Sequence, residues 1–180
     1  QNHFPEMEDI ASHLCEKIDN HAPLNEEWLS EFLRLSHGVA VQRMEKPVAG
    51  RSYGYDTNGK LLWFRKNVPQ STRQFQMAQL IAELEYQKHL KTTPEVTSLI
   101  SPIAQMGALR YLSSYIAGAM LFPYEQVLRL AKEARYDIDA LAERFGASFE
   151  QIAHRLVTLK RPGQSGVPFG FLRSDVAGRL

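Results

Sequence analysis

The sequence predicts an α+β fold that is mostly helical, with a small antiparallel β-meander and a C-terminal helical lobe. Apolar residues recur at helical spacing on both sides of residues 39–65. Between those limits, aromatic and β-branched residues surround the turn Asp56-Thr57-Asn58-Gly59, and Asn-Gly suits the positive φ of a tight hairpin. Glycines and a proline near residue 163 then interrupt the helical pattern before a short extended segment.

The elements follow in order along the chain. Residues 5–37 have a helical pattern that Pro23 divides into two helices. After Pro69, Ser71 with Gln74 has the spacing of a capping box, and the helix that follows is apolar on both sides, which predicts a central, buried position. Further helices are predicted over residues 108–121, 127–134, 137–145 and 148–160, and a final strand over residues 167–173.

Composition limits the kind of protein. The 180 residues suit one compact domain or one domain with an appended lobe, and we expect residues 1–135 to form the first part and residues 136–180 a helix pair and strand packed on the same core. Basic and acidic residues number 21 and 20, so no overall charge attracts nucleic acid or a membrane. No apolar run approaches the ~20 residues of a membrane span.

The cysteine count predicts a compartment. Cys15 is the only cysteine of the chain, which excludes an internal disulfide within these residues and fits a reducing, cytoplasmic location. The sequence opens on Gln1, and its last segment resembles an interrupted extended passage. We therefore expect a fragment of a longer protein.

The segment Gln74–Glu83 has the frame of a zinc-peptidase helix without its chemistry. An HExxH site needs two histidines four residues apart and a glutamate beside the first, which accepts a proton from the metal-bound water. Those positions are held here by Gln79, Glu83 and Leu80. Leucine cannot act as a base and one carboxylate does not hold zinc, so neither a catalytic residue nor a metal site is predicted.

A second segment has a similar character. Leu112–Pro123, read with the Gln74–Glu83 helix, resembles the ImmA/IrrE-like peptidase fold, whose motif EANxFAAxLLMP it matches in outline. The resemblance implies that the leading position is the third zinc ligand, and here it is Leu112. The fold is therefore expected to be a degenerate, zincin-type ImmA/IrrE domain, a pseudo-peptidase.

The C-terminal third narrows the resemblance. It is similar to the short-chain fatty-acyl-CoA transcriptional regulators, of the propionate or methylcitrate-cycle type, over residues 135–138, 142–152, 154–163 and 166–173. This resemblance implies an acyl-CoA effector, transcription regulation of propionate or acetate genes, and a homo-oligomer. It also implies DNA binding only through a helix-turn-helix ahead of this chain, and a cysteine-rich segment behind it that holds an iron-sulfur cluster in some members.

An acyl-CoA site needs cations for phosphates, an aromatic surface for adenine and an apolar slot for the acyl group. Two basic clusters with interleaved aromatic residues could supply these, one in the meander and one at the C-terminal end. The former peptidase cleft supplies the third group of candidates. The candidate ligand-binding residues are Arg51, Tyr53, Lys66, Gln79, Glu83, Ser114, Tyr115, Arg155, Lys160, Phe169, Phe171 and Arg173.

Three alternatives remain open at this point. A metallopeptidase with an atypical metal site could use Glu83 and a histidine supplied from elsewhere. A dimerisation module without a ligand would show a closed core. The pair of short helices around Ser148 could form a DNA-reading helix-turn-helix, but Phe149 and Glu150 are poor residues for contacting bases or phosphates, and Arg155 occupies a position that usually packs inward.

Overall fold

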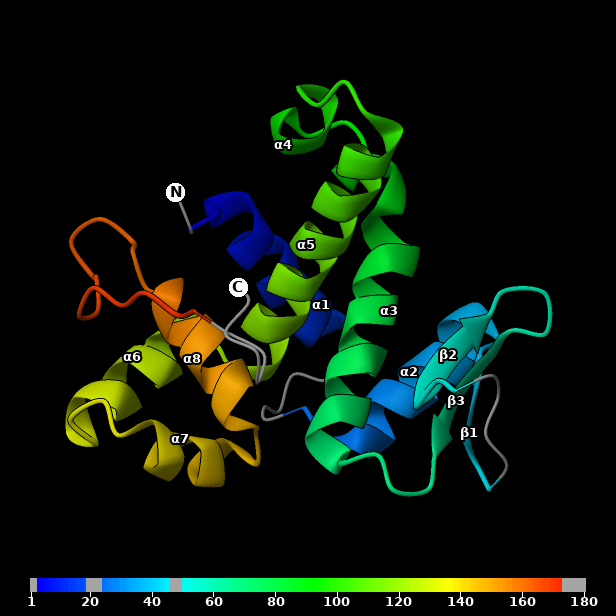
Figure 1. Ribbon diagram of the computed structural model, residues 1–180, viewed down its shortest axis with the longest axis horizontal. Coiled ribbons are helices and arrows are strands. Elements are labelled where there is room, and N and C mark those ends of the chain that lie inside the picture. Colours follow the sequence, from blue (N-terminus) through cyan, green and yellow to red (C-terminus); the bar gives the residue numbers. More distant parts are fainter. Residues whose placement is uncertain (1–2, 19–23, 46–49, 173–180) are drawn as a thin grey trace. The chain divides into compact units, whose positions relative to one another are not determined.

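The computed structural model describes residues 3–18, 24–45 and 50–172. The chain divides into two compact units (Figure 1). The larger unit comprises Met7–Leu121, and the smaller one is built on the residues from Phe122 onward together with the start of the chain. The predicted division between residues 1–135 and 136–180 stays a prediction.

Helices form most of the larger unit. They are α1 (Pro5–Ile18), α2 (Glu26–His37), α3 (Gln70–Leu90), α4 (Pro94–Thr97) and α5 (Pro102–Leu121). Helices α3 and α5 lie along each other (Figure 1), and Met77, Ile81 and Ile116 are fully buried. Helix α3 therefore has the central position that its apolar pattern predicts. It begins at Gln70 after Pro69, so Ser71 is not its N-cap as the pattern suggested.

A three-stranded sheet completes this unit, formed by β1 (Ala40–Met44), β2 (Tyr53–Asp56) and β3 (Leu61–Arg65). The strand order is β1-β3-β2, with β1 parallel to β3 and β2 antiparallel to it. The predicted antiparallel meander is therefore wrong, although its hairpin is confirmed. The apolar run in β3 explains the order, since Leu62, Trp63 and Phe64 are all buried and a strand buried on both faces belongs in the centre.

The hairpin turn differs from the expected geometry. The Asp56 side chain accepts a hydrogen bond from the backbone N–H of Asn58 at 3.0 Å, which makes an Asx turn. The positive φ falls on Lys60, at 45°, and not on the Asn-Gly pair. The Lys60 ammonium donates to the backbone carbonyl of His37, which lies at the end of α2. The turn is therefore tied to the preceding helix.

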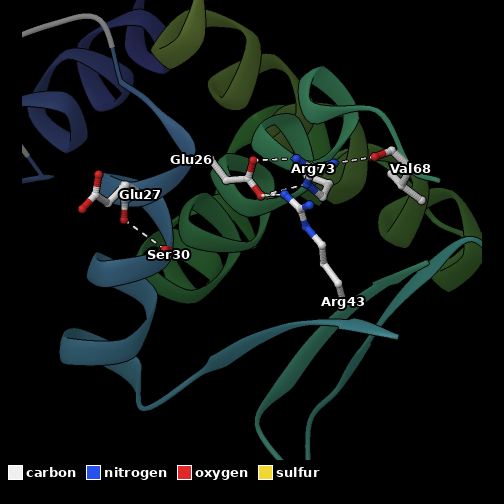
Figure 2. Close-up of polar contacts among 6 residues, drawn as sticks. All are labelled: Glu26, Glu27, Ser30, Arg43, Val68 and Arg73. Carbon is white, nitrogen blue, oxygen red and sulfur yellow. Dashed lines mark hydrogen bonds and ion pairs between the residues drawn. The ribbon is translucent and has the colours of Figure 1, made fainter. Parts of the chain in front are cut away.

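An ion pair joins α2 to α3 (Figure 2). Arg73 is only 7% exposed, and its Nε and Nη2 atoms lie 2.8 and 2.7 Å from the two carboxylate oxygens of Glu26. A third nitrogen, Nη1, donates to the carbonyl of Val68, just before α3. Arg43 of β1 approaches the same carboxylate at 3.6 Å. One glutamate thereby joins α2, β1 and the start of α3.

The smaller unit contains α6 (Tyr124–Glu133), α7 (Ile138–Phe145) and α8 (Phe149–Val157). Helices α7 and α8 have defined caps. Asp137 accepts from the Ala140 N–H, Gly146 ends α7 in the left-handed conformation, and Ser148 with Gln151 forms a reciprocal capping box. Helix α8 ends at Val157, three residues earlier than predicted.

The predicted final strand is wrong within the described residues. Residues 167–172 form no strand, and Arg173 lies outside the described residues. Tyr136 holds the segment, because its hydroxyl accepts the Val167 N–H at 3.1 Å and its ring packs on Phe169. Gly166, Pro168 and Gly170 explain the difference, because glycine and proline weaken strands and proline cannot donate to a ladder.

Candidate functional site

A pocket of about 720 Å³ opens in the larger unit, between the sheet, α3 and α5. The chain just before β2 contributes Arg51 and Ser52 to its wall. The complete lining is Arg51, Ser52, Tyr53, Gly54, Tyr55, Leu62, Phe75, Gln76, Gln79, Leu80, Glu83, Arg110 and Ser114. Its volume lies within the roughly 300–1,000 Å³ range of small-molecule and cofactor sites.

Helical spacing explains why α3 and α5 present these side chains together. Gln76, Gln79 and Glu83 are three and then four residues apart, so they lie on one face of α3. Arg110 and Ser114 are four residues apart on α5 and share a face in the same way. The pocket therefore has a polar stripe on each helix.

Hydrogen bonds fix Glu83 within this pocket. The Ser113 hydroxyl lies 3.1 Å from Glu83 Oε1, and the Gln79 Nε2 atom lies 3.4 Å from the same oxygen. Ser113 is fully buried, and its hydroxyl also lies 3.0 Å from the carbonyl of Leu109 and 3.2 Å from that of Arg110, so Glu83 is one of three acceptors for its single proton. The two α3 positions that would carry zinc-binding histidines are thus joined to each other by a hydrogen bond.

The residues present do not fit a zinc ion. Leu80 and Leu112 occupy the positions of the base and the third ligand, and both are buried. Within residues 3–18, 24–45 and 50–172, no group of three histidine, cysteine, aspartate or glutamate side chains could hold a metal. Glu83 alone does not make a zinc site, which needs three or four protein ligands.

Two exposed arginines stand at the rim of the pocket, Arg51 before β2 and Arg110 on α5. Among the described residues, no hydrogen bond or ion pair engages either guanidinium. The aromatic side chains of Tyr53, Tyr55 and Phe75 line the wall, with Tyr53 37% exposed. The arrangement can accept an anion at the rim and an apolar or aromatic group along the wall.

The structure brings together five of the candidates that the sequence predicts, namely Arg51, Tyr53, Gln79, Glu83 and Ser114. Two further candidates of the larger unit do not line the pocket. Lys66 pairs with Glu45 on the surface. Tyr115 is buried, and its hydroxyl donates to Glu8 Oε1 at 2.7 Å.

The C-terminal candidates lie in the smaller unit and have local roles. Arg155 is 3% exposed, and its Nε donates to the carbonyl of Phe122 at 2.8 Å. Phe169 and Phe171 pack against the rings of Tyr136 and His154. Lys160 is exposed, and Arg173 lies outside the described residues. A buried Arg155 agrees with the inward position that argues against a DNA-reading helix.

Sequence reasoning missed Arg110 and Gln76. Arg110 lies four residues before Ser114, and Gln76 lies three residues before Gln79, so helical spacing from known candidates was a signal for both. Arg110 follows a long uncharged stretch, and such a stretch is typical of a core segment and not of a binding site.

A zincin-like helix without a zinc ligand set, packed against a second helix and a small mixed sheet, defines a metallopeptidase-like domain. The chain belongs to the family of IrrE N-terminal-like domains, whose family model matches residues 34–157. The predicted ImmA/IrrE resemblance is confirmed by this match.

The resemblance to acyl-CoA regulators is confirmed at the level of homology to transcription regulators. The chain is 44% identical over 109 residues to a propionyl-CoA carboxylase regulator of Cereibacter sphaeroides, covering 61% of this chain and 24% of that protein. It is 37% identical over 154 residues to the HTH-type transcriptional regulator PrpR of Mycobacterium tuberculosis, covering 84% and 31%. The HTH-type transcriptional regulator RamB of the same species is 32% identical over 185 residues, covering 100% and 38%.

A solved structure agrees with these relatives. A Mycobacterium tuberculosis transcriptional regulator superposes with a TM-score of 0.88 at 31% identity, over 99% of this chain and 55% of that chain. The chain spans between about a quarter and two fifths of the length of the curated relatives that it matches.

None of the described helices combines the length and apolar character needed to cross a lipid bilayer.

Proposed function

We propose that the chain is a non-catalytic, effector-sensing domain of a bacterial transcription regulator, and that its effector is a short-chain acyl-CoA. The observation that carries this proposal is the pocket on α3, with two arginines at its rim and a hydrogen-bonded Gln79–Glu83 pair at the former metal positions. The homologous regulators support the regulatory part of the proposal.

The pocket has the chemical parts that a CoA ester requires. Arg51 and Arg110 can each form charge-assisted hydrogen bonds with phosphate oxygens. Tyr53 and Tyr55 offer ring surface for the adenine. Leu62 of β3, with Phe75 and Leu80 of α3, offers apolar surface for the acyl chain. Arg51 before β2 and Arg110 on α5, rather than the C-terminal basic cluster, thus form the proposed phosphate site.

The absence of catalysis follows from the same positions. Leu80 cannot accept a proton from water. The three positions of the zinc ligands supply only one carboxylate, Glu83, so peptide hydrolysis has neither a base nor a metal. DNA binding and any iron-sulfur cluster are assigned, in this proposal, to segments beyond this chain. A cytoplasmic homo-oligomer is the proposed working form, and no cofactor is proposed within these residues.

Regulation requires that the effector distinguish two states of the protein. A ligand shifts such an equilibrium only by its difference in affinity for the two states. Since the pocket walls come from the sheet and from two helices, a ligand that contacts all three can favour one arrangement of β2 against α3. This is the proposed origin of the signal.

Calorimetric titration tests the proposal. The 180-residue chain is titrated with propionyl-CoA, acetyl-CoA and free CoA, and its thermal midpoint is measured with each. We expect saturable binding and a ligand-dependent rise in the midpoint, because a ligand that binds only the folded state stabilises it. Arg51→Ala and Arg110→Ala are each expected to weaken binding about tenfold, through loss of a charged hydrogen bond.

Arg34→Ala is the matched control for these variants. Arg34 is an exposed arginine of α2 in the same unit, and it pairs with Glu31 rather than lining the pocket. Its removal changes the net charge equally and is expected to leave CoA affinity unchanged. The proposal is abandoned if none of the three compounds binds, or if all three arginine variants lose affinity alike.

A further inference from the structure

The charges in the pocket are unevenly distributed. Both arginines are exposed, whereas Glu83 is half-buried between Ser113 and Gln79 and lies next to the buried Leu80. Glu83 is also the only acidic residue among the lining residues. The rim is therefore positive, and the less exposed part of the pocket carries a negative charge.

Glu83 cannot easily turn away from a ligand. One of its oxygens is held by contacts to Gln79 and Ser113, and these residues come from two different helices. Ser113 is fully buried and Glu83 is half-buried, so this contact reaches the carboxylate from the protein interior. A ligand group that enters beside α3 therefore meets a carboxylate that contacts side chains of both α3 and α5.

A CoA ester would be oriented by this distribution. Its phosphates match the exposed arginines, which leaves the acyl group for the less exposed part, near Leu80 and Glu83. A neutral acyl chain contacts leucine there without penalty. An acyl chain that ends in a carboxylate places two like charges side by side in a partly desolvated site, which is unfavourable.

We propose that Glu83 is a specificity-determining residue, which admits CoA esters of neutral short acyl groups and rejects those whose acyl group ends in a carboxylate. This inference rests on the proposed function, since it concerns the same pocket. It adds a repulsive element to the site, and a specific site generally combines such elements with attractive contacts. In this role Glu83 selects the ligand and takes no part in a chemical reaction.

The test compares butyryl-CoA with succinyl-CoA by isothermal titration calorimetry on the 180-residue chain. The two esters have acyl groups of equal carbon number and differ in a terminal methyl or carboxylate. We expect succinyl-CoA to bind about tenfold or more weakly than butyryl-CoA, since the repulsion of two like charges in contact, at the effective dielectric constant found near a protein surface, exceeds that factor. This comparison needs no variant.

Two variants then assign the effect to one side chain. Glu83→Gln keeps an oxygen that can accept from Ser113 but removes the charge, and we expect it to reduce the difference between the esters to about threefold or less. Glu95→Gln removes the same charge from an exposed position of α4 outside the pocket, and is expected to keep the full difference. Circular dichroism confirms that both variants are folded.

The outcomes separate the two proposals. If neither ester binds, the proposed function fails. If both bind the unaltered chain equally well, the effector class stands and the role of Glu83 is wrong. The role is also wrong if Glu83→Gln and Glu95→Gln preserve the difference equally, because the discrimination then comes from the shape of the pocket and not from this charge.

Discussion

At the scale of single residues, the buried Arg73 shows how one side chain can fix several elements. Its guanidinium satisfies both oxygens of Glu26 and the carbonyl of Val68 (Figure 2). Hydrogen bonding from Arg73 is the main cause that holds the pKa of Glu26 below its usual value of 4.5, against an opposing effect of burial. The carboxylate is thus stabilised in its charged form.

Replacing this arginine is expected to destabilise the chain. Arg73→Met keeps a similar apolar stem but removes the arginine's own donors to Glu26 and Val68, leaving Arg43 beside the carboxylate. We expect a loss of about 2 kcal/mol in the free energy of unfolding, since the glutamate is also a quarter exposed. Denaturant unfolding at neutral pH measures it. Arg34→Ala, at an exposed arginine–glutamate pair of α2, is the control and is expected to have no measurable effect.

The same pair predicts a pH dependence. Because the pKa of Glu26 is lower in the folded state than in the unfolded one, the unfolded state binds more protons near pH 4.5, and stability falls as the pH falls through the folded pKa. The difference between the unaltered chain and Arg73→Met should therefore narrow below that pH. A difference that stays constant down to pH 3 would show that the pair contributes through packing alone.

At the scale of elements, a close packing contact joins β2 to β3. A Cβ atom added to Gly54 would lie 2.8 Å from Cζ2 of Trp63, and the tryptophan is 7% exposed. Gly54 also lines the pocket. The absence of a side chain at this position lets the indole lie against the β2 backbone, and it also shapes the wall beside α3.

Gly54→Ala is expected to lower stability by about 1–3 kcal/mol, because the indole must move within a packed core. Denaturant unfolding followed by tryptophan fluorescence measures it. Gly107→Ala is the matched change on α5, where an added Cβ meets nothing within 4 Å, and it is expected to stabilise the chain by about 0.5–1 kcal/mol. Equal effects of the two substitutions would mean that Trp63 adapts freely.

Local patterns predicted the helices well and the sheet incompletely. Caps such as Ser148–Gln151 and stops such as Gly146 depend on neighbouring residues, so the sequence contains them directly. The pairing of β1 with β3 depends on which strand is central, and alternation within each strand does not specify this. The strand predicted over residues 167–173 was wrong, because residues 167–172 have no regular secondary structure.

The candidate site could be predicted in part for the same reason. Gln79, Glu83 and Ser114 fall at spacings that relate them to a known catalytic frame, and helix geometry brings them together. Arg110 belongs to no such frame. Its spacing of four residues from Ser114 was its sequence signal, and the packing of α5 along α3 brings it to the pocket. Arg155 was misleading, since a cation among aromatic residues resembles a phosphate site, whereas its Nε donates to the Phe122 carbonyl and its Nη1 to the Thr158 hydroxyl.

At the scale of the whole molecule, electrostatics is local. With 21 basic and 20 acidic residues, the chain has almost no net charge to attract a polyanion from a distance. The two rim arginines must therefore supply the attraction for phosphates themselves. The complete pocket lies within Met7–Leu121, so the proposed ligand contacts belong to one of the two compact units.

The parallel pairing of β1 with β3 has a consequence for the time course of folding. Strands β2 and β3 are neighbours along the chain and close through a tight turn, whereas β1 pairs with β3, the far strand of that hairpin, across a longer loop. Closing the longer loop costs more chain entropy, so we expect β1 to dock last. Pulse-labelled hydrogen exchange during refolding should protect the Arg65 amide, which donates to the Ser52 carbonyl beside β2, before the Ala40 amide of β1, which donates to the Lys60 carbonyl, and simultaneous protection would rule this order out.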